Sequence, residues 1–378
     1  MTPTELEKVI RGEIGRSGGI LPFRRFMELA LYHPEHGYYA SGRARVGKSG
    51  DFYTSVSVGR IYGRLLASVC REIWQCLGEP EEFTVVEQGA NDGTMAADIL
   101  GRIREEGGAF AEALRYRITE PFPVNRARQE EKLSGFENVF WHEANEDLPE
   151  FTGLHLSNEL LDAFPVDSLR WNGSEWEEEG VSLEGDSLVW RTLPITEPDL
   201  LERATLLPVP PREGWRFEIN RGIDPWLVGI ASRMKQGLIL TVDYGQVGND
   251  RFAPHRADGT LLAYRNHERF DDPLAEPGLR DITAQVDFTD LAAKAVAIGL
   301  RPIAYSDQQH FLMGAAEPWM RSLGDHAPEH RKDLLALNTL LTPSLMGSQF
   351  KALALGKDFP VDHPLACFKY QRPGIEAL

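Results

Sequence analysis

Cysteine is scarce in this chain, and its three copies follow no functional pattern. Cys70, Cys76 and Cys367 have neither the spacing of a zinc site nor the even number of a disulfide framework. Unpaired thiols of this kind are typical of a reducing compartment, where disulfides do not persist. The sequence therefore predicts no disulfide and no metal centre.

Positive charge is also in deficit. Lys and Arg number 40 against 57 Asp and Glu, which gives a formal net charge of -17, and no basic run interrupts this balance. A surface that binds nucleic acid needs clustered cations to neutralise the phosphates. The composition therefore argues against nucleic acid as a partner.

Long apolar stretches are missing as well, since no run is long enough to span a bilayer. The first residues, MTPTELEKVIRGEIG, space their apolar side chains as on one face of a helix and carry balanced charges. They resemble neither a secretory signal nor an Arg-rich transit peptide. We expect no membrane partner and a cytoplasmic location.

The 378 residues, of which 42% are hydrophobic, can build a full core. Helical periodicity extends over residues 3–16, 22–32 and 57–77, and a glycine-rich loop separates the last two. From residue 83 onward, the segments FTVVEQ, LRYRITE and GLHLSNE alternate with helical segments. This alternation predicts an α/β fold with a parallel sheet and crossover helices.

Residues 166–192 interrupt the alternation with short segments that end at glycines, which predicts antiparallel hairpins. We therefore expect two parts. Residues 1–80 form an N-terminal helical cap with a glycine-rich lid loop. Residues 81–378 form the α/β domain, with a β-rich insertion at about residues 166–215.

The turn after the first strand is a candidate ligand site. In VVEQGANDGTMAADIL, Gly89 and Gly93 stand where a strand passes to a helix. Glycine there either supplies unusual backbone angles or lets a ligand approach the N–H groups, although a purely structural turn has the same pattern. Asn91 occupies the position of the middle glycine of a G-x-G-x-x-G turn, which argues against a nicotinamide cofactor.

Glu120, at the end of the next strand, favours a ligand-binding role for the glycine turn over a purely structural one. A carboxylate in this position lies beside the first turn and can accept both hydroxyls of a ribose, although alone it also fits a solvated acid. Together the two features predict a nucleoside-bearing cofactor. Because the turn lacks a glycine needed to hold phosphates, S-adenosylmethionine fits best.

Longer motifs resemble a known family. They are LPFRRFMELALYHPEHGYYA, GDFYTS, VVEQGANDGTMAADIL, SNELLDAFPV, VDYG and the segment GTLLAYRNHERFDDPLAEPGLRDITAQVDFTDL. Their order resembles the MidA-like family of S-adenosylmethionine-dependent methyltransferases, which includes a mitochondrial complex I assembly factor that methylates a protein arginine. The resemblance covers about Gly19 to Leu291 and resumes near the end of the chain. It implies a class I methyltransferase fold, with a mostly parallel seven-stranded sheet, an N-terminal helical cap and a small β-rich insertion.

The resemblance also implies which residues bind the cofactor. The turn would line its methionine part, Glu120 would hold the ribose, and Glu143 with Ala144 would lie near the adenine. The segment that ends at Thr54 would fold over the cofactor as a lid, where local sequence alone fits a surface turn nearly as well. The expected cofactor-binding residues are Asp51, Phe52, Tyr53, Thr54, Glu87, Gly89, Ala90, Asn91, Gly93, Glu120, Glu143 and Ala144.

Two segments depart from the family pattern. The family's G-x-G-R-G is GANDG here, so Asn91 replaces a glycine and Asp92 replaces an arginine. Val56 and Ser57 stand where the family tends to have Pro-Glu. A reversed charge beside the site affects the acceptor more readily than the cofactor, so the departures leave open a changed substrate or a loss of catalysis.

The segment SNELLDAFPV follows the fourth strand, on the side that faces the methyl group in such a sheet. Asn158, Glu159 and Asp162 are therefore the expected catalytic residues. Methyl transfer requires a positioned nucleophile and, where that group carries a proton, its removal. Paired acids suit a guanidinium, a planar cation with a fork of donors. The alternative is that Asn158 caps a helix and Glu159 is an acid of its first turn.

Four other polar residues have two interpretations each. Asp243 in VDYG and Asp287 in TAQVDF fit either a place in the cleft or a structural role. His267 and His310 are general bases by residue type, but a lone histidine is more often structural.

We expect a methyltransferase that uses S-adenosylmethionine and acts on a protein side chain, arginine above all. A small-molecule O- or N-methyltransferase and a cofactor-binding assembly factor without catalysis are the alternatives, and the absent glycine disfavours a dinucleotide oxidoreductase. The sequence leaves open the acceptor, the number of methyl groups transferred and the oligomeric state, a homodimer included.

Overall fold

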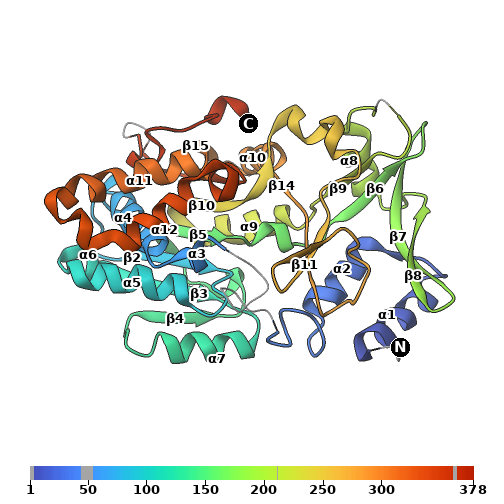
Figure 1. Ribbon diagram of the computed structural model, residues 1–378, viewed down its shortest axis with the longest axis horizontal. Coiled ribbons are helices and arrows are strands. Elements are labelled where there is room, and N and C mark those ends of the chain that lie inside the picture. The colour runs from blue at the N-terminus through green and yellow to red at the C-terminus, as the bar shows by residue number, and fades with distance from the viewer. Residues whose placement is uncertain (1–3, 44–53, 211, 361–363) are drawn as a thin grey trace.

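The computed structural model describes residues 4–43, 54–210, 212–360 and 364–378. Its centre is a sheet with the strand order β15-β16-β10-β5-β2-β3-β4, to which the two-residue β14 adds an eighth strand beside β10. Helices cover both faces of this sheet (Figure 1). The strands are β2 (Phe83–Gln88), β3 (Leu114–Thr119), β4 (Val139–His142), β5 (Phe151–Asn158), β10 (Met234–Gln246), β14 (Val286–Asp287), β15 (Arg301–Asp307) and β16 (Phe350–Lys357).

The sheet differs in detail from the expected seven mostly parallel strands. Five neighbouring strands, from β10 to β4, run parallel. β16 runs antiparallel to both β10 and β15, and β14 is the strand that the sequence did not predict. The expected α/β architecture is confirmed, whereas the strand count is wrong by one because the short β14 pairs with the end of β10.

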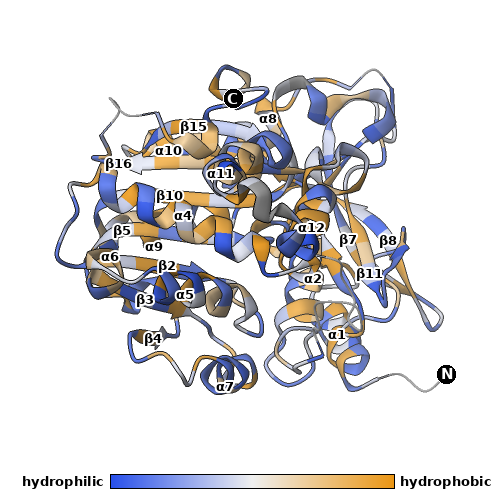
Figure 2. Cartoon of the chain, turned by 60° about the vertical axis from the view of Figure 1, so that its left-hand side comes forward, coloured by the Kyte–Doolittle hydropathy of each residue, from blue (hydrophilic) through white to orange (hydrophobic). Residues whose placement is uncertain are grey.

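Alternating side chains of the strands supply the two faces of the core. In β10, Leu238, Leu240 and Val242 pack with α4, α5, α11 and α12, whereas Ile239 faces α9 and α10. Successive side chains of a strand point to opposite faces, so a strand buried on both faces is apolar at consecutive positions. Apolar colour accordingly fills β5 and β10 in Figure 2, whereas α7, at the sheet edge, is largely hydrophilic. The helices are α3 (Ser55–Val58), α4 (Ile61–Cys76), α5 (Thr94–Glu106), α6 (Ala109–Ala113), α7 (Pro123–Lys132), α9 (Ile223–Arg233), α10 (Phe288–Ala297), α11 (Gln308–Leu323) and α12 (Arg331–Leu341).

A second, smaller core lies beside the main sheet. Buried side chains of α1 and α2 pack there with Val181 of β7 and Ile282 of β13, and Figure 1 shows α1 and α2 next to β7 and β8. The strands form one five-stranded antiparallel sheet and one of three strands. The elements are α1 (Glu5–Arg16), β1 (Leu21–Pro22), α2 (Phe23–Tyr32), β6 (Asp167–Trp171), β7 (Trp176–Glu184), β8 (Ser187–Leu193), α8 (Pro198–Leu206), β9 (Arg216–Ile219), β11 (Leu262–Arg265), β12 (Glu268–Phe270) and β13 (Asp281–Thr283).

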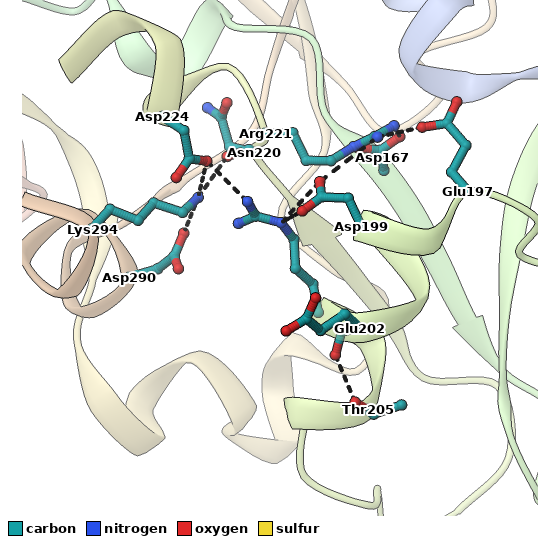
Figure 3. A network of polar contacts seen from close by, with 11 residues as sticks. Asp167, Glu197, Asp199, Glu202, Thr205, Asn220, Arg221, Asp224, Asp290 and Lys294 are labelled. Carbon is teal, nitrogen blue, oxygen red and sulfur yellow. Dashed lines mark hydrogen bonds and ion pairs between the residues drawn. The ribbon is translucent and has the colours of Figure 1, made fainter. Parts of the chain in front are cut away.

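Ion pairs tie the smaller part to the main sheet (Figure 3). Arg221 binds both carboxylate oxygens of Asp167 on β6, at 2.7 and 2.8 Å. Arg203 of α8 and Lys294 of α10 both contact Asp224 of α9, each at 3.1 Å. Because Asp167 is only 1% exposed, its pairing with Arg221 offsets a desolvation cost that an isolated carboxylate would carry in full.

The strand order also locates the place where a ligand fits. The chain passes from β4 at the edge to β5 on the other side of β2, so the order reverses between β2 and β5. In an open α/β sheet, the crevice beyond the carboxyl ends of the strands at such a reversal is the usual binding site. Here that crevice lies after Gln88 and Asn158.

Candidate active site

A cavity of about 440 Å³ lies at the ends of β2 and β5. It is lined by Thr54, Val56, Ser57, Gly59, Arg60, Glu87, Gly89, Ala90, Asn91, Asp92, Thr94, Met95, Asp98, Asn158 and Glu159. Seven of the residues expected at the site therefore share one cavity: Thr54, Glu87, Gly89, Ala90, Asn91, Asn158 and Glu159. Met95 and Asp98 of α5 also line it, and no local pattern distinguishes them beyond their place on the helix after the turn.

The backbone of the glycine turn explains its composition. Gly89 and Gly93 have φ angles of 81° and 80°, and Asn91 between them has 48°. All three lie in the left-handed region, which glycine adopts freely and which asparagine tolerates better than most other residues. Asn91 thus preserves the path of the turn despite replacing the family's glycine.

Asp92, which replaces the family's arginine, has its charge balanced locally. Its carboxylate accepts a hydrogen bond from the N–H of Thr94 (3.0 Å) and forms an ion pair with Lys132 (2.5 Å). Burial opposes ionisation, but the contacts with Lys132 and Thr94 lower the pKa of Asp92 below its ordinary value. The departure therefore places a carboxylate paired with Lys132 at the cavity rather than an uncompensated charge.

Glu87 is the buried carboxylate of the cavity. The hydroxyl of Tyr116 donates to its Oε2 (2.5 Å), whereas Oε1 has no hydrogen-bond partner among the described residues. Burial raises the pKa of Glu87 to about 7. An orphaned carboxylate oxygen beside a glycine turn fits a ligand that brings a cation or a hydrogen-bond donor.

Glu120 lies just beyond β3 and is 5% exposed. It accepts hydrogen bonds from the N–H of Phe122 (3.0 Å) and the side-chain amide of Gln129 (2.8 Å). The same amide of Gln129 donates to the carbonyl of Asn91 (2.8 Å), so Gln129 joins the expected ribose-binding acid to the turn. Glu120 itself does not line the cavity. Gln129 was not predicted, because nothing in its local sequence distinguishes it from other polar residues of α7.

The remaining expected cofactor residues lie near the cavity or outside the described residues. Glu143 and Ala144 follow β4; Glu143 is exposed, and the N–H of Ala144 bonds to Asp147 (3.1 Å). Gly93 begins α5, where an added Cβ would lie 3.4 Å from Gln129. None of these three lines the cavity. Asp51, Phe52 and Tyr53 lie outside the described residues.

Asn158 and Glu159 end β5 at the cavity wall. Glu159 has a φ of 51°, an uncommon backbone conformation for a glutamate. Its Oε1 accepts hydrogen bonds from the N–H of Ser55 (3.2 Å) and from the side-chain amide of Asn158 (3.0 Å). The alternative interpretation as helix-start residues is wrong, because the short 3₁₀ helix that follows begins at Leu161 and has Leu160 at its N-cap.

Two further acids lie close to Glu159 but do not line the cavity. Asp162 is 6% exposed, and Asp243 is fully buried. Burial, and secondarily the neighbouring carboxylates, raise the pKa of Glu159 to about 8 and that of Asp162 well above its ordinary value. Burial likewise raises the pKa of Asp243 to about 7. Asp281 adds a fourth carboxylate, to which the hydroxyl of Tyr39 donates (2.9 Å).

The structure assigns structural contacts to the other polar candidates. Asp243 accepts hydrogen bonds from the N–H groups of Leu160 (3.0 Å) and Leu161 (2.8 Å) and so fixes the turn after β5. Asp287 caps α10. His310 bonds to Asp307, and neither it nor the exposed His267 lines the cavity.

The described part of the chain contains neither a cluster of metal-ligating side chains nor a membrane-spanning helix. No three side chains of His, Cys, Asp or Glu are grouped there as metal ligands would be. None of the helices described is both long and apolar enough to cross a bilayer.

Comparison with known proteins agrees with this geometry. The model of the family described as "Putative S-adenosyl-L-methionine-dependent methyltransferase" matches residues 65–306. A crystal structure of a protein from Burkholderia thailandensis bound to S-adenosyl-homocysteine superposes with a TM-score of 0.87, at 27% identity and over 98% of both chains. A native crystal structure from the same organism gives a TM-score of 0.84, also at 27% identity and over 98% of both chains.

Curated relatives carry a more specific name. "Protein arginine methyltransferase NDUFAF7 homolog, mitochondrial" of Drosophila melanogaster is 29% identical, over 93% of this chain and 84% of its own length. "Protein arginine methyltransferase NDUFAF7, mitochondrial" of Homo sapiens is 26% identical, over 90% of this chain and 81% of its own length.

These names correct one expectation. We expected a cytoplasmic location from the composition and the first residues, whereas the relatives from Drosophila melanogaster, Danio rerio and Homo sapiens are all named as mitochondrial proteins. The expectation was wrong because composition reports only that a compartment is reducing, and such evidence does not distinguish one reducing compartment from another.

The family model covers more than half of the chain, and the strand order places the cavity at the ends of β2 and β5. This protein therefore belongs to the family of S-adenosyl-L-methionine-dependent methyltransferases.

Proposed function

We propose that this protein transfers a methyl group from S-adenosylmethionine to a guanidinium nitrogen of an arginine side chain in a protein. The observation that supports this acceptor best is the group of carboxylates formed by Glu159, Asp162 and Asp243. None of the three forms an ion pair with a described Lys, Arg or His, and their pKa values are all raised. Buried acids in this state favour a ligand that carries a positive charge.

The residues around the turn fit the cofactor. Gly89 is exposed at the cavity wall, so a ligand can approach its backbone. Glu87 would face the cationic methionine part through its orphaned Oε1, and Glu120 would accept the ribose hydroxyls. Glu143 and Ala144 would contact the adenine at the end of β4. When bound, S-adenosylmethionine supplies an electrophilic methyl group.

Glu159 would act on the acceptor. One carboxylate oxygen is held by two donors, whereas Oε2 has no hydrogen-bond partner among the described residues. An arginine side chain could therefore donate to Oε2 and, with Asp162 nearby, be held through two of its N–H groups. A nearby cation lowers carboxylate pKa values, so binding would ionise both acids. The two carboxylates would then hold the positive charge of the guanidinium away from the attacking nitrogen. They would also accept the proton that this nitrogen loses.

The N-terminal part would shape the entrance for the acceptor. Tyr32 of α2 donates to the carbonyl of Ala163 (2.8 Å), and its ring stacks on that of Tyr39 with 5.5 Å between centroids. We propose that residues 1–80 form a cap, and that the β-rich insertion at about residues 166–215 supports it from behind. Aromatic rings beside carboxylates are suited to a planar cation.

The names of the relatives agree with this acceptor, since they describe protein arginine methyltransferases. Incubation of the purified protein with labelled S-adenosylmethionine and host lysate, followed by mass spectrometry of the labelled species, tests the proposal. Methylarginine in a protein would support it. If only small molecules carried the label, the acceptor would be a small molecule and not a protein. If the protein bound the cofactor but transferred no methyl group, it would be a non-catalytic assembly factor.

A further inference from the structure

Asn158 and Ser55 donate hydrogen bonds to the carboxylate of Glu159, and buried residues that do not line the cavity fix both of these donors. On one side, the hydroxyl of Tyr62 on α4 donates to Oδ1 of Asn158 (2.6 Å). That bond leaves the amide nitrogen of Asn158 to donate to Glu159 Oε1 (3.0 Å). Tyr62 is fully buried, so no water competes for its hydroxyl.

The second side comes from the other end of the sequence. The hydroxyl of Ser55 donates to Oε1 of Gln308 (2.9 Å), and the side-chain amide of Gln308 donates to the carbonyl of Leu340 (3.3 Å). This fixes the backbone of Ser55, whose N–H donates to Glu159 Oε1 (3.2 Å). Ser55 and Gln308 are both fully buried.

From these contacts we propose that Tyr62 and the Ser55–Gln308 pair are positioning residues that aim the free oxygen of Glu159 at the acceptor. The inference rests on the proposed function of Glu159. The hydrogen bonds from Asn158 and from Ser55 both end on Oε1, so Oε2 is the oxygen left for the ligand. Tyr62 has a specific task within this arrangement, because an Asn158 amide turned by 180° would present its carbonyl oxygen to Glu159 and repel it. In that orientation the Tyr62 hydroxyl would also lose Oδ1 as the acceptor of its proton, which adds to the cost of turning the amide.

Tyr62→Phe removes only the hydroxyl. We expect kcat to fall by about 3- to 10-fold, as for the loss of one neutral hydrogen bond, with cofactor affinity unchanged by calorimetry. Ser55→Ala removes the other anchor and should lower kcat in the same way, which keeps the test valid if Tyr62→Phe does not fold. Tyr305→Phe is the matched control, since Tyr305 is fully buried and its hydroxyl has no partner among the described residues. It should retain wild-type kcat.

The pH profile separates positioning from packing. The titratable groups around Glu159 are Tyr62 of α4, Asp162, Asp243 and Tyr244 of β10, and Asp281 of β13. The hydrogen bond from Asn158 lowers the pKa of Glu159, so its loss should move the acidic limb of the kcat profile to higher pH. A loss of packing alone would reduce kcat at every pH without moving the limb.

A double-mutant cycle with Glu159→Gln decides the matter. If Tyr62 acts through Glu159, Tyr62→Phe should have no further effect on kcat once Glu159 is glutamine. The positioning role would be overturned if Tyr62→Phe lowered kcat equally in the wild-type and Glu159→Gln backgrounds. It would also be overturned if the folded Tyr62→Phe variant kept the wild-type kcat and the wild-type acidic limb of the pH profile. Wild-type activity of Glu159→Gln itself would instead overturn the proposed function of Glu159, so the two failures are distinguishable.

Discussion

Substitution of Gly89 by alanine tests whether glycine is required there only for its left-handed backbone or also to leave space for a ligand. With φ at 81°, an alanine there pays about 1 to 2 kcal/mol in backbone strain. Its Cβ would lie 3.2 Å from Cδ1 of Leu160, a flexible side-chain end that can move by a few tenths of an ångström. The fold should therefore survive. The added methyl group would stand at the cavity wall, where we propose that the cofactor contacts the backbone, and should weaken S-adenosylmethionine binding by at least about tenfold, or about 1.4 kcal/mol.

Gly78 provides the matched control. Its φ is 84°, it is exposed after α4, and an added Cβ would meet nothing within 4 Å. Gly78→Ala should lower the free energy of unfolding by the same about 1 to 2 kcal/mol in a denaturant titration, yet leave cofactor affinity unchanged by calorimetry. Equal cofactor affinity in Gly89→Ala and Gly78→Ala would refute the reasoning, because it would show that the glycine turn serves the backbone alone.

Three further predictions concern single carboxylates. Because burial raises the pKa of Glu87 to about 7, the anionic form of Glu87 becomes more populated as the pH rises from 6 to 8. The affinity for the cofactor should therefore rise with pH over that interval, at most about tenfold per pH unit. Calorimetry of Glu87→Gln should lack this component, and an identical pH dependence in both proteins would remove Glu87 from the site. Glu120→Gln should weaken cofactor binding by about 1.5 to 3 kcal/mol with the fold intact, the range for a hydrogen bond to a charged group; unchanged affinity would exclude a ribose contact. Arg221→Met leaves the buried carboxylate of Asp167 without its ion-pair partner and should lower the free energy of unfolding by about 3 to 5 kcal/mol. Removal of Glu197, the exposed partner of Arg221, should lower it by at most about 1 kcal/mol. Similar denaturation midpoints for the two variants would contradict this.

Much of the fold was predictable because its signals are local. The strand segments, the crossover helices and the glycine turn are each contained in a few consecutive residues, and the nearly continuous apolar run of β10 follows from its burial on both faces. A strand of two residues such as β14 has too short a pattern to detect. The expected helix over residues 57–77 is in fact α3 and α4, because the chain breaks at Gly59.

The candidate site was predictable only where one motif carries it. Glu87, Gly89 and Asn158 come from motifs that end strands at the sheet reversal, and they share the cavity. Gln308 bonds to Ser55 across 253 positions of sequence, and Gln129 of α7 joins Glu120 to the glycine turn. Such contacts depend on tertiary packing, which no local pattern encodes.

The measurement that tests the central claim most directly is the rate of labelled methyl transfer from S-adenosylmethionine to an arginine peptide, compared between the wild type and Glu159→Gln. The variant keeps the size and the hydrogen bonds of Glu159 but loses the charge that would hold the guanidinium and accept its proton. We predict that the wild-type protein forms methylarginine and that the rate falls by about 10²- to 10⁴-fold in the variant, the range for loss of a general base. A folded Glu159→Gln protein that methylates the peptide at the wild-type rate would contradict the account.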